Sequence, residues 1–129
     1  MTDANAVLLA VIALAQATNP YATIMIGPLP ADNSICMGIS AGYDESSFMS
    51  RNAVVTLDVV CNGKHTDQQT VSEALNAIHA ALTRATSYPT GTGWQILNIK
   101  TSALPSYIEK QDNGQFLYGS ALTVEYYDK

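Results

Sequence analysis

Residues 53–85 read AVVTLDVVCNGKHTDQQTVSEALNAIHAALTRA, and this stretch decides the fold class. In its first nine residues, apolar side chains occupy every second position. Half of the residues between them are polar. This period of two predicts a strand over residues 53–61 with one buried face. Asn62-Gly63 then favours a turn. From residue 66 the apolar residues recur at helical spacing, and Thr66 with Gln69 three positions later matches a capping box. We therefore expect a helix over residues 66–85.

The helix carries an unbroken apolar stripe, which must lie against another element, most naturally the sheet. The stripe consists of Val71, Ala74, Leu75, Ile78, Ala81, Leu82 and Ala85. Apolar residues three and four positions apart predict a second helix over residues 3–18, ended by Asn19-Pro20. Further strands are expected at residues 22–26, 34–42, 94–101, 106–111 and 116–127.

The connections complete the expected architecture. A long polar loop is expected at residues 42–52, and Leu104-Pro105 is expected to separate two strands. Asp112-Asn113-Gly114 predicts a hairpin turn between the last two strands. This order of elements predicts an α+β fold, a mainly antiparallel sheet with two helices packed on one face. The length is that of a single domain over residues 1–129.

The composition is poor in charge. Charged residues make up 13% of the chain, about half of the usual ~25%. Six basic and eleven acidic residues give a net charge of -5. A surface that binds many phosphates needs clustered lysines and arginines, so a generic nucleic-acid-binding protein is excluded. So few charges also indicate a surface that is partly covered by partners.

The apolar N-terminal stretch does not predict a membrane segment. Residues 6–15 are too few to span a bilayer. No basic residue precedes them, as one would in a signal peptide. We expect a soluble, intracellular protein without membrane contact. Cys36 and Cys61 are expected to be small buried side chains, and spacing alone leaves their pairing open.

No pattern in the sequence carries catalytic chemistry. Gly91-Thr92-Gly93 has neither the Lys-Ser/Thr of a phosphate-binding loop nor the third glycine of a dinucleotide motif. The two histidines, His65 and His79, do not form the spacing of a metal site with Cys36 and Cys61. We therefore expect no enzyme activity, no catalytic residue, no metal and no cofactor.

Several local patterns follow one another in a characteristic order along nearly the whole chain. They are Gly27-Pro28-Leu29-Pro30 after the first helix, the strand at 54–60 that runs into the amphipathic helix, Gly93-Trp94 before Ile96-Leu97-Asn98-Ile99, the link at Pro105, and Tyr107-Ile108-Glu109 facing residues 118–124 across a turn. In this order of elements the chain resembles the tail terminator proteins of long-tailed bacteriophages, also called tail completion or minor capsid proteins.

The resemblance implies a structural role in the virion. Tail terminators form a ring, typically of six subunits, on the head-proximal end of the tail tube. The ring stops tube polymerisation and meets the connector, or stopper, of the head. The implied partners are other copies of the chain, the tail tube protein and the head connector. DNA passes through the ring without being gripped, which suits an acidic chain with two arginines. The implied location is the head–tail junction, after assembly in the host cytoplasm.

A closed ring needs two different contact patches on each subunit. The candidates are Tyr43, Phe48 and Met49 in the long loop and Tyr126-Tyr127 at the end of the last strand. Local packing of the loop residues, and a core position for Tyr126, are the alternatives. Asp44 and Glu45 are candidates for the lumen of the ring, where negative charge repels DNA phosphates.

Other functions stay open at this point. A connector or stopper on the head side of the neck is also a small ring former. A small binding module or enzyme would use Trp94, the tyrosines and His79 on one face of the sheet. A stand-alone cytosolic α+β protein is the third alternative. The tail type, the host and the partner proteins are not encoded in any pattern of the sequence.

Overall fold

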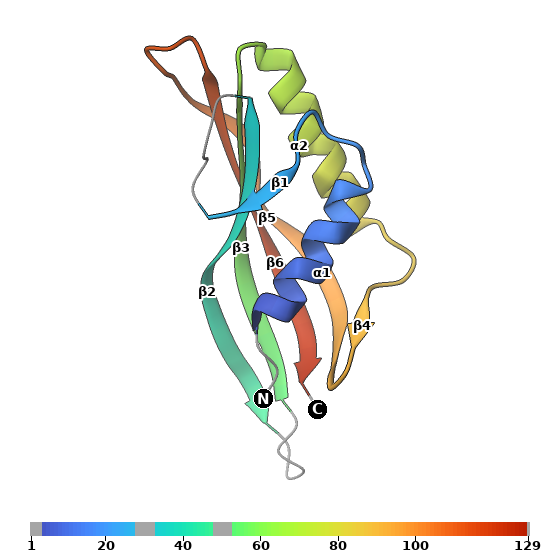
Figure 1. The fold of residues 1–129 in the computed structure, drawn as a ribbon. Helices are drawn as coiled ribbons and strands as arrows, with labels where there is room; N and C mark the ends of the chain where they lie inside the picture. The colour runs from blue at the N-terminus through green and yellow to red at the C-terminus, as the bar shows by residue number, and fades with distance from the viewer. Residues whose placement is uncertain (1–3, 28–32, 48–52, 129) are drawn as a thin grey trace.

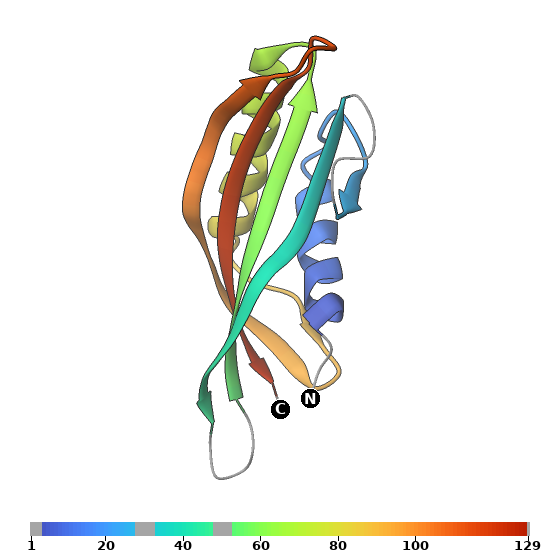
Figure 2. The ribbon, with the colours of Figure 1, turned by 90° about the vertical axis from the view of Figure 1, so that its left-hand side faces the viewer.

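A computed structural model describes residues 4–27, 33–47 and 53–128 as one sheet covered on one face by two helices (Figures 1 and 2). The helices are α1 (Ala4–Gln16) and α2 (Gln68–Thr83), and the strands are β1 (Ile24–Ile26), β2 (Ser34–Ser47), β3 (Ala53–His65), β4 (Thr90–Gly91), β5 (Trp94–Lys110) and β6 (Phe116–Asp128). The strand order is β1-β2-β3-β6-β5-β4. All strand pairs are antiparallel except β1 with β2. The predicted α+β class, with its mainly antiparallel sheet, is confirmed.

The core lies between the sheet and the helices. Alternate residues of β3 and β6 point toward the helices and are buried, as the period of two predicts. They meet the apolar stripe of α2, in which Leu75, Ile78 and Leu82 are fully buried. Figure 2 shows α2 behind the β3–β6–β5 half of the sheet and α1 behind the β1–β2 half. The other face of the sheet carries no helix in the described part of the chain.

The cap of α2 is Asp67 rather than the expected Thr66. The Asp67 side chain accepts a hydrogen bond from the backbone N–H of Gln69 and another from the Thr70 hydroxyl. Gln69 donates to Glu73 instead of reaching back to the cap residue. The capping box is therefore wrong by one position, because the aspartate places its carboxylate on the orphan N–H groups and adds a favourable negative charge at the helix start.

The predicted turn at Asn62-Gly63 is wrong, because both residues belong to β3, which continues to His65. Gly63 pairs with Ile35 on one side and Tyr118 on the other. A Cβ atom at Gly63 would lie 2.9 Å from the Tyr21 hydroxyl and 3.0 Å from Val71. The glycine is there because α2 and Tyr21 approach the strand closely, and not because the chain turns.

The predicted loop at 42–52 is also wrong in its first half. β2 continues to Ser47 and pairs with β3 through Ser47 and Ala53. Tyr43, Asp44 and Glu45 therefore lie on a strand. The pairing of β2 with β3 shifts register after Ile39 and after Asp44, as it does where a bulge places an extra residue in one strand.

The predicted break at Leu104-Pro105 is absent, and β5 is one strand of 17 residues. Its pairing with β6 shifts register four times, once between Ala103 and Ser106, where Pro105 lies. The short β4 pairs only with Trp94 and Gln95 of β5. Pro105 thus lies on an outer edge of the sheet, where a missing N–H breaks no ladder bond. The β5–β6 hairpin, confirmed around Asp112-Asn113-Gly114, projects beyond the start of β2 on the side away from the helices (Figure 1).

Candidate interaction surfaces

The structure brings several sequence-predicted contact residues to one end of the sheet. We call a row of residues that are paired across neighbouring strands a rung. Tyr43 of β2 lies on the same rung as Glu125 of β6, and Asp44 lies on the same rung as Tyr126, with β3 between the two strands. Tyr126 is 2% exposed and packs in the core, which is the alternative that the sequence left open. Tyr127 points to the other face of the sheet and is half-buried.

The remaining candidates are placed less fully. Glu45 follows Asp44 at the irregular end of β2, at the same end of the sheet. Phe48 and Met49 lie outside the described residues. Within the described part of the chain, Tyr127 is a half-buried candidate, and Tyr43, Asp44 and Glu45 are candidates located by the strand β2.

The exposed apolar side chains instead gather at two opposite edges of the sheet. Among the described residues, Met25 and Ile26 on β1 are 47% and 53% exposed, and Leu104 and Ile108 on β5 are 72% and 54% exposed. We call Met25 and Ile26 the β1 patch, and Leu104, Tyr107 and Ile108 the β5 patch. Leu9 is also exposed, on α1 behind the β1–β2 half. Leu97 is exposed at the other end of β5.

The two patches begin at the two ends of one rung of the sheet. Ile24 of β1 pairs with Ile35, which pairs with Gly63, and Gly63 pairs with Tyr118, which pairs with Tyr107 of β5. The β1 patch follows directly after Ile24, and the β5 patch surrounds Tyr107. Because neighbouring strands hold their rungs level, the two patches lie at the same height on opposite edges.

The β5 patch is held in place by its neighbours. The Tyr107 ring meets the Tyr118 ring edge-on at 6.0 Å and lies 6.4 Å from the Phe116 ring. Ile108 lies over Gly119, where a Cβ atom would be 2.6 Å from its Cδ1. At the tip, the Gln115 side chain accepts a hydrogen bond of 2.8 Å from the backbone N–H of Asn33, which ties the hairpin to the start of β2. An ordered patch loses little side-chain entropy on contact.

The α1 helix carries no charged residue. Val7, Leu8, Val11 and Ala15 are buried beneath it, yet its outer side adds Leu9 at 55% exposure. A helix that is apolar on nearly all sides is typical of a buried position, so its outer side is suited to a protein contact.

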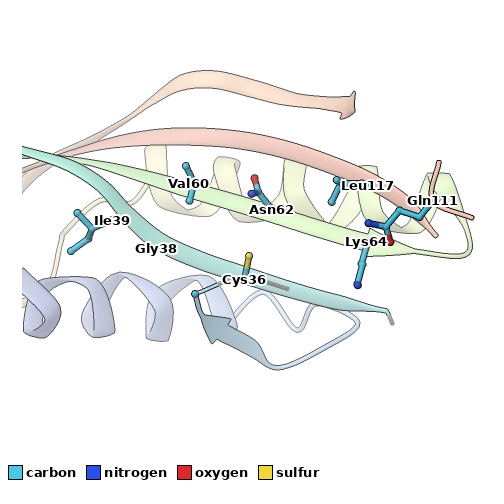
Figure 3. A pocket seen from close by; sticks show the side chains of 9 residues that line it. Cys36, Gly38, Ile39, Val60, Asn62, Lys64, Gln111 and Leu117 are labelled. Carbon is cyan, nitrogen blue, oxygen red and sulfur yellow. The ribbon is translucent and has the colours of Figure 1, made fainter. Parts of the chain in front are cut away.

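The uncovered face of the sheet contains a hollow of about 480 Å³ near the β1 edge (Figure 3). It is lined by Gly27, Cys36, Gly38, Ile39, Val60, Asn62, Lys64, Gln111 and Leu117. Lys64 and Gln111 stand together at one end, and apolar or small residues make up most of the rest. The lining offers one charged side chain and one buried thiol, which is not a catalytic arrangement.

The two cysteines lie on opposite faces of the sheet. Cys36 pairs with Asn62, and Cys61 pairs with Met37, so the two residues are diagonal neighbours on adjacent strands. Cys36 faces the hollow, whereas Cys61 lies in the core. Burial raises the pKa of the Cys36 thiol and raises the pKa of the Cys61 thiol to about 12. Both cysteines are free, and a raised pKa favours the protonated thiol, which is the less nucleophilic form.

His79 is buried between α2 and β5. Its Nδ1 lies 2.9 Å from the Thr101 hydroxyl, and its Nε2 has no hydrogen-bond partner within the described ranges. Burial lowers the pKa of this imidazole below its usual value. No group of three potential metal ligands is found among residues 4–27, 33–47 and 53–128. In those same ranges, neither helix has the length and hydropathy needed to cross a bilayer.

Sequence reasoning missed both apolar patches. The available signal was a pair of consecutive apolar residues, which point to opposite faces of a strand. Such pairs occur at Met25-Ile26 and at Tyr107-Ile108. That signal becomes readable only once the strand order shows which strands are at the edges.

The fold is shared with a chain from a gene transfer agent particle. The structure is similar to a chain of the solved structure described as "Virion of native gene transfer agent (GTA) particle", with a TM-score of 0.65 and 13% sequence identity. The alignment covers 96% of this chain and 96% of that chain. The sequence matches no family model and no curated protein. The likeness therefore shows a common fold over nearly the full length.

Proposed function

We propose that the protein is a structural component of a phage-type virion, and specifically the tail terminator. In this role a ring, typically of six copies, caps the head-proximal end of the tail tube and joins it to the head connector. The observation that carries the proposal is the match over 96% of both chains to a chain of the gene transfer agent particle. It agrees with the family that the order of sequence elements resembles.

Two properties of the surface support an assembly role. The chain has half the usual share of charged residues, and its exposed apolar side chains gather at two different edges. Two different patches on one subunit are what a head-to-tail ring requires.

Removing the gene from a particle-producing strain tests the position in the neck. If the protein terminates the tail, electron microscopy shows tail tubes of uncontrolled length and DNA-filled heads without tails. If tails of normal length accumulate beside unjoined heads, the protein acts on the head side, as a connector or stopper, and the tail terminator proposal is overturned. Complementation with the intact gene is the control.

Asp44 and Glu45 are proposed to face the lumen of the ring. They lie at the end of β2, in a segment without a basic residue. Negative charge there keeps DNA phosphates from adhering during passage. Neutralisation by Asp44→Asn with Glu45→Gln is expected to leave particle yield unchanged and to slow DNA delivery. Unchanged delivery kinetics would remove these residues from the lumen, without affecting the proposal for the ring.

A further inference from the structure

The apolar patches at the two sheet edges match each other in their level along the strands and in strand direction. They occupy the two ends of the rung that runs from Ile24 to Tyr107. A closed ring has rotation but no rise from one subunit to the next. If the ring axis is parallel to the strands, height is the position along the strands. Patches at equal height on opposite edges of the sheet then meet when neighbouring copies lie side by side.

Strand direction agrees with this placement. β1 and β2 run parallel, and each step from β2 through β3 and β6 to β5 reverses direction. β5 is therefore antiparallel to β1. Copies in the same orientation place the outer edge of β5 antiparallel to the outer edge of β1, the commoner and slightly more stable pairing of strands. Pro105 has no N–H to donate to a strand of the next copy, so the side chains of the patches form most of the joint.

We propose that the β5 patch of one copy packs against the β1 patch of the next copy, forming the repeated head-to-tail joint of the ring. This inference rests on the proposed ring and adds the residues that close it. Leu104 and Ile108 supply the apolar contact from one side, and Met25 and Ile26 supply it from the other.

Paired cysteines test the joint in assembled particles. Met25 and Ser106 each lie one residue beyond the ends of the shared rung, in the same direction along the sheet. Met25→Cys and Ser106→Cys are introduced into separate chains that both carry Cys36→Ser, because Cys36 is the register partner of Met25, and the two chains are produced together. Mild oxidation is expected to give a covalent dimer of one chain of each kind. With both cysteines in one chain, a ladder of products up to the ring size is expected on a non-reducing gel.

The control places a cysteine on the same strand, β5, at a position that is not level with Met25. Leu97 is exposed on β5, nine residues before Ser106, or roughly 30 Å along the strand. Leu97→Cys with Met25→Cys is expected to give no covalent dimer. Dimers from a single kind of cysteine chain would indicate a symmetric contact and overturn the head-to-tail joint. A cross-link to another virion protein in place of a second copy would also overturn it.

The two proposals fail in different ways. If the protein is present at the neck and the cysteine pair does not cross-link, the joint is wrong and the tail terminator proposal stands. If the cysteine chains do not enter particles, Met25→Lys and Leu104→Glu replace them. Each single variant is then expected to abolish assembly, and the double variant is expected to restore it through the new ion pair. Failure of the double variant to restore assembly overturns the joint.

Discussion

At the scale of single residues, His79 is an ionisable group held in the core. It lies between α2 and β5, is 4% exposed, and has its Nδ1 next to the Thr101 hydroxyl. Burial favours the neutral imidazole, and the pKa is lowered from 6.5. The unfolded chain therefore takes up a proton at a higher pH than the folded chain does.

This difference predicts that the fold loses stability as the pH falls. The contribution of neutral His79 is fully present above pH 6.5 and is lost as the pH falls toward the lower pKa of the folded state. Denaturant unfolding at several pH values between 8 and 5 measures it. His79→Asn keeps a partner for Thr101 and is expected to show a smaller loss over the same range. An equal loss in both proteins would assign the pH dependence to other groups.

At the scale of elements, the start of α2 separates two candidate caps. Asp67 accepts two hydrogen bonds at the helix start, whereas the backbone N–H of Thr66 donates to Asn33. We expect Asp67→Ala to lower the free energy of unfolding by about 1 kcal/mol, the usual worth of an N-cap. Thr66→Ala is the matched control and is expected to have little effect. Thermal or denaturant unfolding of both variants distinguishes them, and the reverse order would restore the capping box.

The pairing of β2 with β3 predicts that Cys36 and Cys61 form no disulfide in the folded chain. Cys36 and Cys61 are neighbours on adjacent strands but point to opposite faces, so a disulfide between them would require the strands to come apart. After incubation with a mild oxidant, the folded chain is expected to keep two free thiols. Alkylation after unfolding, followed by mass measurement, counts them. A loss of two hydrogens from the intact chain would contradict the assignment of faces.

The periodicity of apolar residues predicted which helices and strands exist. It did not predict where the strands end. The face shared by Tyr118, Leu122 and Val124 was readable because burial on one side of a strand imposes a period of two. Asn62-Gly63 resembles a turn locally, and only the approach of α2 explains a glycine within β3. Leu104-Pro105 resembles a break, and only its edge position makes a proline tolerable in β5. Both errors come from tertiary contacts that a local pattern does not contain.

At the scale of the whole molecule, the core and the proposed assembly surface consist of different apolar residues. Leu75 is fully buried under the sheet, and Leu104 is 72% exposed at the outer edge of β5. Leu75→Ala is expected to lower the free energy of unfolding by about 3 kcal/mol through the cavity it leaves. Leu104→Ser is expected to change it by less than about 0.5 kcal/mol and to reduce ring formation.

Unfolding measurements and native mass of the same two variants check this separation. Incorporation into particles is the second readout for each variant. If Leu104→Ser unfolds as easily as Leu75→Ala, Leu104 belongs to the fold and not to the assembly surface.

The candidate surface was less predictable than the fold. The low charge content predicts a surface partly covered by partners, and the residues chosen from the sequence were apolar and aromatic residues in a predicted loop and at a strand end. Tyr126 lies in the core because its alternate position on β6 faces the helices. The exposed set, with Met25 and Leu104, depends on which strands are outermost. Strand order is a property of the whole chain, so no single stretch of sequence contains it.

The proline in the outer strand also bears on the life of the chain before assembly. A long unpaired strand edge with apolar side chains is a template for uncontrolled growth of sheet between chains. Pro105 withholds one N–H from that edge, and the register shifts of β5 bend it away from a flat ladder. In the proposed role, unassembled subunits are therefore expected to resist fibre formation while keeping apolar side chains at this edge for the ring.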